Sequence, residues 1–243
     1  MVIIVRFPET RSILLFAAFL YRVKYHKNMN HFLCHIQKWR FEHIQLTFTP
    51  CSAKGTVIDG LFEIQPKVFG DNRGYFFEVY SEKEFKAAGL TAAFVQDNQS
   101  SSSKGVLRGL HFQTQHPQGK LVRAVSGRVY DVAVDLRNGS ETFLRYYGVI
   151  LDGEKQNQFY IPEGFAPGFY VLSSTAVFAY KCTDFYDPAG EDGIMWNDAQ
   201  IGIRWDSIAP GITPVLSEKD GNHQYLDRNS SCFDIHGRWC GNR

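Results

Sequence analysis

The chain has few cysteines, little net charge and no long apolar run. Its five cysteines are odd in number, widely spaced and without a Cys-x-x-Cys pair, which argues against a disulfide framework or a thiolate zinc site and favours a reducing, cytoplasmic location. A formal charge of +1 argues against a polybasic nucleic-acid binder. The motifs G-x-G-x-x-G, G-x-x-x-x-G-K-[ST], H-E-x-x-H and G-x-S-x-G are also missing, so nothing supports a dinucleotide fold, a phosphate-binding loop, a zinc protease or a serine hydrolase.

Apolar and aromatic residues, by contrast, are plentiful. Hydrophobic residues make up 44% of the 243 positions and aromatic residues 15%, which is typical of a folded protein rather than a disordered one. The 20 Phe and 12 Tyr, together with 21 Gly against 9 Pro, favour β structure with many turns. The length allows one large domain or two small ones.

The N-terminal part differs from the rest in charge. Residues 1–55 hold eight basic and two acidic side chains, whereas the remainder is net acidic. We therefore expect a basic N-terminal extension over residues 1–58, either poorly ordered or non-native residues added by an upstream start codon. Its apolar run, Ile13–Tyr21, would rise only about 14 Å as a helix, half of a bilayer core. Arg22 follows at once without a signal-peptide cleavage site, so we expect neither export nor membrane association.

From Gly60 onward the spacing of apolar residues changes to two, which is typical of β-strands. Across residues 128–136 apolar side chains alternate with Asp and Ala, and turn signals separate this run from others of its kind. The capping-box-like run Ser81–Glu84 predicts one helix over residues 81–88. Regular short strands with turns predict an antiparallel sandwich or barrel with few helices. The other expected strands are residues 74–80, 121–125, 146–151, 168–172 and 176–186.

One short stretch carries chemistry. Arg108 and His111 are three residues apart, so a regular strand would send them to opposite faces. Gly109 between them would permit a bulge that turns both toward one cavity. With Lys120, they would place a general base beside anion-binding cations. A single strand histidine is more often structural, so this pattern alone leaves both interpretations open.

Seven blocks of sequence then follow one another across residues 59–228. They are Phe69–Glu78, Phe94–Asn98, Val106–Gln113, Ile161–Ala166, Tyr180–Tyr186, Trp196–Asp198 with Ile201–Ile203, and Leu216–Asp220. In content and order they resemble the signature motifs of dTDP-4-dehydrorhamnose 3,5-epimerases. The resemblance implies an epimerase domain over residues 59–228, followed by a tail over residues 229–243. It also implies a mainly β, antiparallel jelly-roll (cupin-like) barrel and a homodimer.

The sequence itself argues against a metal. The first cupin motif, Gly105–Gln113, contains His111 but has Gln113 where a second histidine ligand would lie. The second motif, Pro162–Pro167, has no histidine. One imidazole cannot hold a transition metal, which typically needs about three or four protein ligands. We therefore expect no metal, and the resemblance implies that no cofactor is needed.

The resemblance implies conversion of dTDP-4-dehydro-6-deoxy-D-glucose into dTDP-4-dehydro-L-rhamnose, in dTDP-L-rhamnose biosynthesis for cell-surface polysaccharide. C3 and C5 both flank the C4 ketone, so a base can remove either proton to leave an enolate, and an acid on the opposite face returns a proton. By family position His111 is the base and Asp220 orients it. Tyr180 is the proton donor, and Lys120 stabilises the enolate oxygen.

Family position also assigns the substrate contacts. Arg73 and Arg108 would bind the diphosphate as charge-assisted pairs. Tyr186 or Phe76 would stack on the thymine, unless these are core aromatics of the barrel, and Lys219 would bind substrate unless it is a solvated surface charge. The full set is Arg73, Glu78, Gln96, Asp97, Asn98, Arg108, Glu191, Lys219 and Tyr186.

One position departs from the family pattern. Pro167 stands where a histidine usually contacts the substrate, and proline removes both an imidazole and a backbone N–H. A lost hydrogen bond to a charged partner costs about 1.5–3 kcal/mol. Two alternatives therefore stay open: a relative that inverts only C3 or isomerises the ketone of a dTDP-deoxysugar, and a catalytically weak nucleotide-sugar-binding protein.

Overall fold

The computed structural model describes residues 46–226 and 233–241, which belong to one compact unit. Residues 1–45, which include the apolar run Ile13–Tyr21, lie outside the described residues. Residues 227–232, where the expected domain ends and the tail begins, also lie outside them. The unit is built mainly of antiparallel strands with two short helices, α3 (Glu82–Ala87) and α4 (Trp205–Ile208), among the described residues. The mainly β fold class is thus confirmed.

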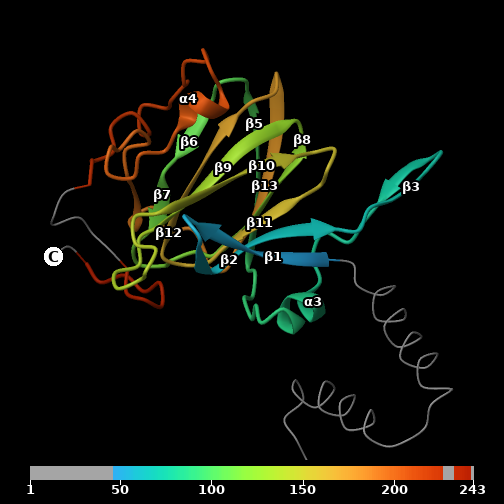
Figure 1. Ribbon diagram of the computed structural model, residues 1–243, viewed down its shortest axis with the longest axis horizontal. Helices are drawn as coiled ribbons and strands as arrows, with labels where there is room; N and C mark the ends of the chain where they lie inside the picture. Colours follow the sequence, from blue (N-terminus) through green and yellow to red (C-terminus); the bar gives the residue numbers. More distant parts are fainter. Residues whose placement is uncertain (1–45, 227–232, 242–243) are drawn as a thin grey trace, which may run out of the picture. The chain divides into compact units, whose positions relative to one another are not determined.

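Two antiparallel sheets face each other (Figure 1). The larger has six strands in the order β1-β2-β11-β8-β13-β5, and the smaller has four in the order β10-β9-β12-β6. Neighbours in both sheets are often distant in sequence, as in a jelly roll. The larger sheet consists of β1 (Leu46–Ala53), β2 (Thr56–Pro66), β5 (Gln96–Ser103), β8 (Lys120–Ser126), β11 (Gln158–Ile161) and β13 (Thr175–Cys182). The smaller consists of β6 (Leu107–Gly109), β9 (Arg128–Asp135), β10 (Tyr146–Asp152) and β12 (Phe165–Val171).

Two short ribbons complete the strands. β3 (Phe69–Asp71) pairs with β4 (Gly74–Phe76) in a hairpin that projects from the sheets (Figure 1). β7 (His111–Gln113) pairs with β14 (Glu191–Gly193). The expected strand over residues 74–80 is therefore wrong beyond Phe76. The pairing of β1 with β2 also carries the larger sheet back to Leu46, inside the stretch expected as an extension.

The central strands of the smaller sheet, β9 and β12, are buried on both faces. Toward the larger sheet, Ala133 and Phe169 meet Phe178, whose ring stacks 4.2 Å from that of Phe169. On the other face, Val132 packs against Trp205 of α4 and other C-terminal residues. The period-two pattern over residues 128–136 is thus confirmed as a strand, but its apolar set points to this second core, and the intervening polar side chains point between the sheets.

The helix expected over residues 81–88 forms as α3, but its expected cap does not. Ser81 makes no side-chain capping hydrogen bond. The Glu84 carboxylate instead accepts a hydrogen bond from the backbone N–H of Leu46 at 2.8 Å. The Glu84 carboxylate, which was expected to close the capping box, therefore binds the first residue of β1. The local sequence around the helix does not reveal this contact.

Candidate active site

Two hollows between the sheets share three of the expected catalytic side chains. One, of about 190 Å³, is lined by residues of β5, β6, β8, β9, β12 and β13; the other, of about 310 Å³, opens toward Tyr186 and Glu191. His111, Lys120 and Tyr180 line both hollows. We call the two together the His111 cavity. The sequence blocks that carry these residues thus converge on one place.

Arg108 and His111 reach this cavity through a strand break. Gly109 ends β6 with φ +129° and faces Gly168 of β12, where a Cβ on Gly109 would lie 2.6 Å from the Gly168 Cα. Only glycine fits this conformation and approach. The chain then leaves the smaller sheet and pairs with β14. The shared cavity is confirmed, whereas the expected bulge is wrong: β6 and β7 are separate strands in different sheets.

His111 and Asp220 form a hydrogen-bonded pair. The His111 Nε2 lies 2.5 Å from the Asp220 Oδ1, and Asp220 is only 3% exposed. The Ser217 hydroxyl donates to the other carboxylate oxygen at 2.7 Å. Burial alone would raise the pKa of Asp220, but the hydrogen bonds from His111 and Ser217 lower it from 3.8 to about 2. Asp220 therefore stays anionic, and a His111 that donates Nε2–H to it keeps its lone pair on Nδ1.

Tyr180 and Lys120 are neighbours in the cavity, with the Lys120 Nζ 5.9 Å from the centre of the Tyr180 ring. Burial, together with the nearby Cys182, raises the pKa of Tyr180, with Arg108 opposing, so the phenol holds its proton at neutral pH. Burial lowers the pKa of Lys120. The pair thus offers a proton donor beside a partly desolvated cation.

Asp131 is a cavity residue that sequence reasoning missed. It lies on β9, is buried, and its Oδ1 has no hydrogen-bond partner among the described residues. Burial raises its pKa well above the usual range, while the charge of Lys120 opposes this. The available signal was a carboxyl group inside an alternating strand, to which the sequence pattern assigned no role.

The rim of the cavity is polar. Arg108 donates to Ser102 at 3.2 Å, and Gln96 donates to Asn98 at 3.1 Å. The Tyr186 hydroxyl donates to Glu191 at 2.6 Å, and Glu191 also pairs with Lys219. Tyr186 is 49% exposed, so it is not a core aromatic. Of the predicted site residues, the structure brings together His111, Lys120, Tyr180, Asp220, Gln96, Asn98, Arg108, Glu191, Lys219 and Tyr186.

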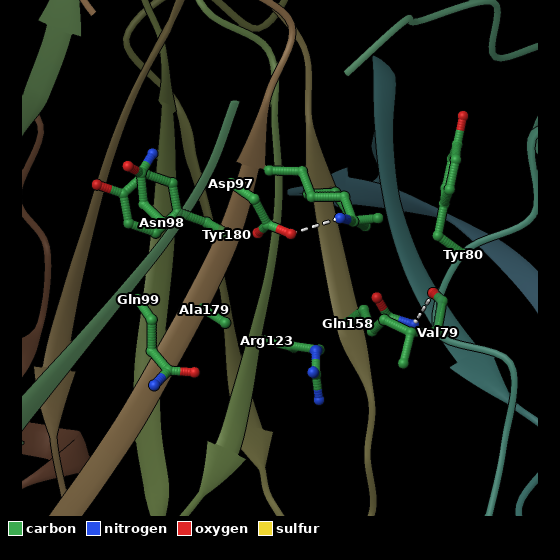
Figure 2. A pocket seen from close by; sticks show the side chains of 11 residues that line it. Val79, Tyr80, Asp97, Asn98, Gln99, Arg123, Gln158, Ala179 and Tyr180 are labelled. Carbon is green, nitrogen blue, oxygen red and sulfur yellow. Dashed lines mark hydrogen bonds and ion pairs between the residues drawn. The ribbon is translucent and has the colours of Figure 1, made fainter. Parts of the chain in front are cut away.

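Asp97 faces the opposite side of the larger sheet. Strand alternation sends Gln96 and Asn98 inward and Asp97 outward, where it pairs with Lys181 at 2.7 Å. Asp97 and Arg123 line a separate hollow of about 580 Å³ on this outer face, shown in Figure 2. The expectation that Asp97 binds substrate beside His111 is therefore not met within one chain.

The β3–β4 hairpin also lies away from the His111 cavity. The Arg73 side chain is 85% exposed and pairs with Asp71, and Phe76 is 73% exposed. Both line a hollow of about 380 Å³ within the hairpin itself. Glu78, in the connection from the hairpin to α3, lines neither hollow of the His111 cavity. Arg73, Phe76 and Glu78 thus stand apart from the other predicted substrate contacts, and neither Phe76 nor Tyr186 is a core aromatic.

His223 is a second residue that sequence reasoning missed. It lies in the segment that follows Asp220, positioned by a bridge between Gln224 and Ile194. Its ring centre is 5.4 Å from that of His111. His111, Asp220 and His223 are a group of possible metal ligands within 4.8 Å of one another. The two cupin motifs contain a single imidazole, that of His111, and the fold adds a second imidazole from outside them.

Pro167, the departure from the family pattern, lines the His111 cavity next to Gly168. At this wall the chain offers a hydrocarbon ring in place of an imidazole.

Among residues 46–226 and 233–241, no helix has the length and hydropathy needed to cross a bilayer.

Residues 55–228 match the family model described as dTDP-4-dehydrorhamnose 3,5-epimerase. The enzyme of that name from Pseudomonas aeruginosa is 54% identical over 174 residues, covering 71% of this chain and 93% of the relative. The one from Methanothermobacter thermautotrophicus is 49% identical over 174 residues, covering 72% and 94%. The crystal structure of a dTDP-6-deoxy-D-glucose-3,5-epimerase from Legionella pneumophila, in complex with dTDP-4-keto-L-rhamnose, superposes with a TM-score of 0.70 at 49% identity, covering 76% of this chain and 95% of that one.

Proposed function

The chain belongs to the dTDP-4-dehydrorhamnose 3,5-epimerase family, and from this membership we propose that it converts dTDP-4-dehydro-6-deoxy-D-glucose into dTDP-4-dehydro-L-rhamnose. It is an isomerase of dTDP-L-rhamnose biosynthesis that inverts C3 and C5. The observation that carries the proposal is the presence of His111, Lys120 and Tyr180 on the walls of one cavity. A base, a cation and a proton donor are the groups that epimerisation beside a ketone requires.

His111 would act first, through Nδ1, which takes the proton from C3 or C5. The electron pair of the broken C–H bond moves into the ring and leaves an enolate at C4. The imidazolium that forms is stabilised by Asp220, whose carboxylate is already hydrogen-bonded to Nε2 at 2.5 Å. Ser217 holds the second oxygen of this carboxylate, so the pair is oriented before substrate arrives.

Lys120 and Tyr180 would complete each inversion. The Lys120 ammonium group stabilises the enolate oxygen in a site where burial strengthens the interaction. The Tyr180 phenol returns a proton to the face opposite to the one from which His111 removed it. The raised pKa of Tyr180, caused mainly by burial, keeps that proton available. A positioned acid or base typically contributes about 10²–10⁴-fold to the rate.

The rim would hold the nucleotide. Arg108 is the cation of the rim placed for a diphosphate, since its guanidinium is hydrogen-bonded only to the Ser102 hydroxyl in the described part of the chain. Tyr186 offers an exposed aromatic face for thymine, and its hydroxyl is fixed by Glu191. Gln96 and Asn98 supply neutral donors and acceptors at the same edge.

We further propose a homodimer in which the β3–β4 hairpin of one copy contributes Arg73 to the cavity of the other. Support comes from the exposure of Arg73 and Phe76 on a projecting hairpin, away from the cavity of their own chain. The test mixes inactive Arg73→Ala and His111→Ala proteins after dissociation. Random reassociation should restore about a quarter of wild-type activity, because half the dimers then hold one intact site. If Arg73 acts within its own chain, mixing restores none.

A cytoplasmic location is part of the proposal. Cys51, Cys182 and Cys240 are free thiols in the described part of the chain, which suits a reducing compartment. To test this, thiols in intact cells are alkylated rapidly and the protein is then isolated and examined by mass spectrometry. The three cysteines should be alkylated, which would show that they are reduced. Oxidised thiols would contradict this location.

Turnover in D2O tests the reaction itself. The expected product carries deuterium at both C3 and C5, read by NMR. One specific observation, Pro167 on the cavity wall, favours a second candidate, a C3-only epimerase or a ketoisomerase. Label at C3 alone would support the single epimerisation. No label despite dTDP binding would support a nucleotide-sugar-binding protein instead.

A further inference from the structure

Three nitrogen and oxygen donors from two segments of the chain meet beside the His111 cavity. His111 comes from β7, and Asp220 and His223 come from the turn after Leu216. One donor atom from each lies within 4.8 Å of the other two. Two imidazoles and one carboxylate are a ligand set typical of Zn²⁺ and of other divalent transition metals.

His223 is held in this group without a polar partner of its own. Its ring packs edge-on against that of His111 and against Gly193, where a Cβ would lie 2.5 Å from the His223 Cε1. The Nε2 of His223 is buried and has no hydrogen-bond partner among the described residues. A buried donor or acceptor without a partner costs free energy, so the arrangement favours a species that the nitrogen can bind.

We propose that His111, Asp220 and His223 form a binding site for Zn²⁺, and that the ion inhibits the enzyme by binding Nε2 of His111, which leaves the ring proton on Nδ1, the atom that would act as the base. The inhibitory part rests on the proposed function, since it requires His111 to be that base. His223 lies outside the blocks that carry the family resemblance, which end at Asp220. It lies within residues 55–228, which match the family model.

Metal binding and catalysis exclude each other on geometric grounds. Ligand atoms about 2.0–2.1 Å from one tetrahedral Zn²⁺ lie about 3.3 Å apart. The His111 Nε2 and the Asp220 Oδ1 are 2.5 Å apart and must separate. The hydrogen bond of the catalytic pair is then lost, and the His111 ring is fixed on the ion. Ser217 can keep its bond to the other Asp220 oxygen and orient this ligand.

The ligand chemistry also sets the selectivity. Mg²⁺ and Ca²⁺ prefer six or more oxygen ligands, and this group offers two nitrogens and one carboxylate. We therefore expect Mg²⁺ to leave the rate unchanged at concentrations at which Zn²⁺ inhibits.

The first test measures initial epimerisation rates of the full chain, stripped of metal, against free Zn²⁺ set by a metal buffer. His223→Gln removes one ligand and keeps a polar side chain. Loss of even an outer-shell partner costs about 10–100-fold in metal affinity, so the inhibition constant should rise at least about tenfold. The matched control is His116→Gln, because His116 is an exposed histidine paired with Asp184 outside the group; its inhibition constant should equal that of the wild type.

The second test does not depend on turnover. Co²⁺ added to the metal-free full chain should give a visible absorption band that is absent from the His223→Gln protein and present in His116→Gln. Equal Zn²⁺ inhibition and equal Co²⁺ spectra in wild type and His223→Gln would overturn the proposal, as would a wild type that binds neither ion. A metal-free protein without epimerase activity would instead overturn the proposed function, and the Co²⁺ spectrum would still report the site.

Discussion

Replacing Asp220 with Asn should slow turnover without disturbing substrate binding. Asn keeps the shape of the side chain and an acceptor oxygen for the His111 Nε2, which lies 2.5 Å away, but it removes the charge that stabilises the imidazolium. The pKa of Asp220, lowered to about 2 despite burial, corresponds to at most about 2.5 kcal/mol at 1.36 kcal/mol per unit. Solvent screening reduces this to about 1.5–2 kcal/mol. We therefore expect kcat to fall about 10–30-fold.

The assay follows epimerisation by NMR under saturating substrate and reports kcat and KM separately. KM should stay within about twofold, since the lost interaction acts on a cation that forms only during reaction. Ser217→Ala is the matched control, because it removes one hydrogen bond to Asp220 and leaves the charge. A kcat unchanged by Asp220→Asn, or an equal loss in Ser217→Ala, would refute the assignment of Asp220 as the partner that stabilises the base.

Further predictions concern the acid, the buried carboxyl group, the C-terminal segment and the pH dependence of stability. Tyr180→Phe should lower kcat about 10²–10⁴-fold but retain solvent exchange of a substrate proton in D2O, which a merely misfolded protein would lose. Asp131→Asn should keep kcat/KM within about threefold at pH 7, because burial raises the pKa of Asp131 and favours its neutral form, which Asn resembles; a loss above about tenfold would contradict this. Phe233→Ala should lower the free energy of unfolding by about 3–5 kcal/mol, because Phe233 is 1% exposed and packs on Phe112. Urea unfolding measures this loss, and an unchanged midpoint would show that the C-terminal segment does not contribute to stability. Asp135→Asn should destabilise the protein at neutral pH. Burial opposes ionisation of Asp135, but hydrogen bonds from Arg137, Ser140 and Thr142 lower its pKa overall. The contribution of Asp135 to folding stability is therefore present above about pH 4 and is lost as the pH falls further. A Tm difference independent of pH would contradict that linkage.

Sequence patterns predicted six of the fourteen strands in the described residues, at least in part: β4, β8, β9, β10, β12 and β13. β9 shows the limit of such patterns: the strand was recognised, but both of its faces are buried, and the pattern assigned no role to Asp131. A strand in the middle of three layers has no solvent face, and only the C-terminal segment, whose path the local sequence does not reveal, supplies the third layer.

Family position predicted residues that the structure brings together, since His111, Lys120 and Tyr180 line the cavity and Asp220 is bonded to His111. Family position did not predict whether each substrate contact lies in the cavity of its own chain or in that of a second copy. Arg73 carries a matching motif yet lies on a hairpin remote from its own cavity. Asp97 was predictable as outward-facing, because its neighbours in the strand were expected to face the cavity.

His223 was beyond reach of the sequence for a different reason. Its contact with His111 depends on the turn at Asp220 and on the bridge to Ile194. No spacing in the chain encodes such a tertiary contact. The same holds for Phe233, which lies beyond the family match at residues 55–228.

Hydrogen–deuterium exchange at the two carbons beside the sugar ketone tests most directly whether His111 is the base of this cavity. The substrate is incubated in D2O with wild-type protein and with His111→Ala, and the C3 and C5 proton signals are followed over time. We expect both signals to disappear with the wild type and to persist with the variant. Exchange at the wild-type rate in His111→Ala would contradict the assignment.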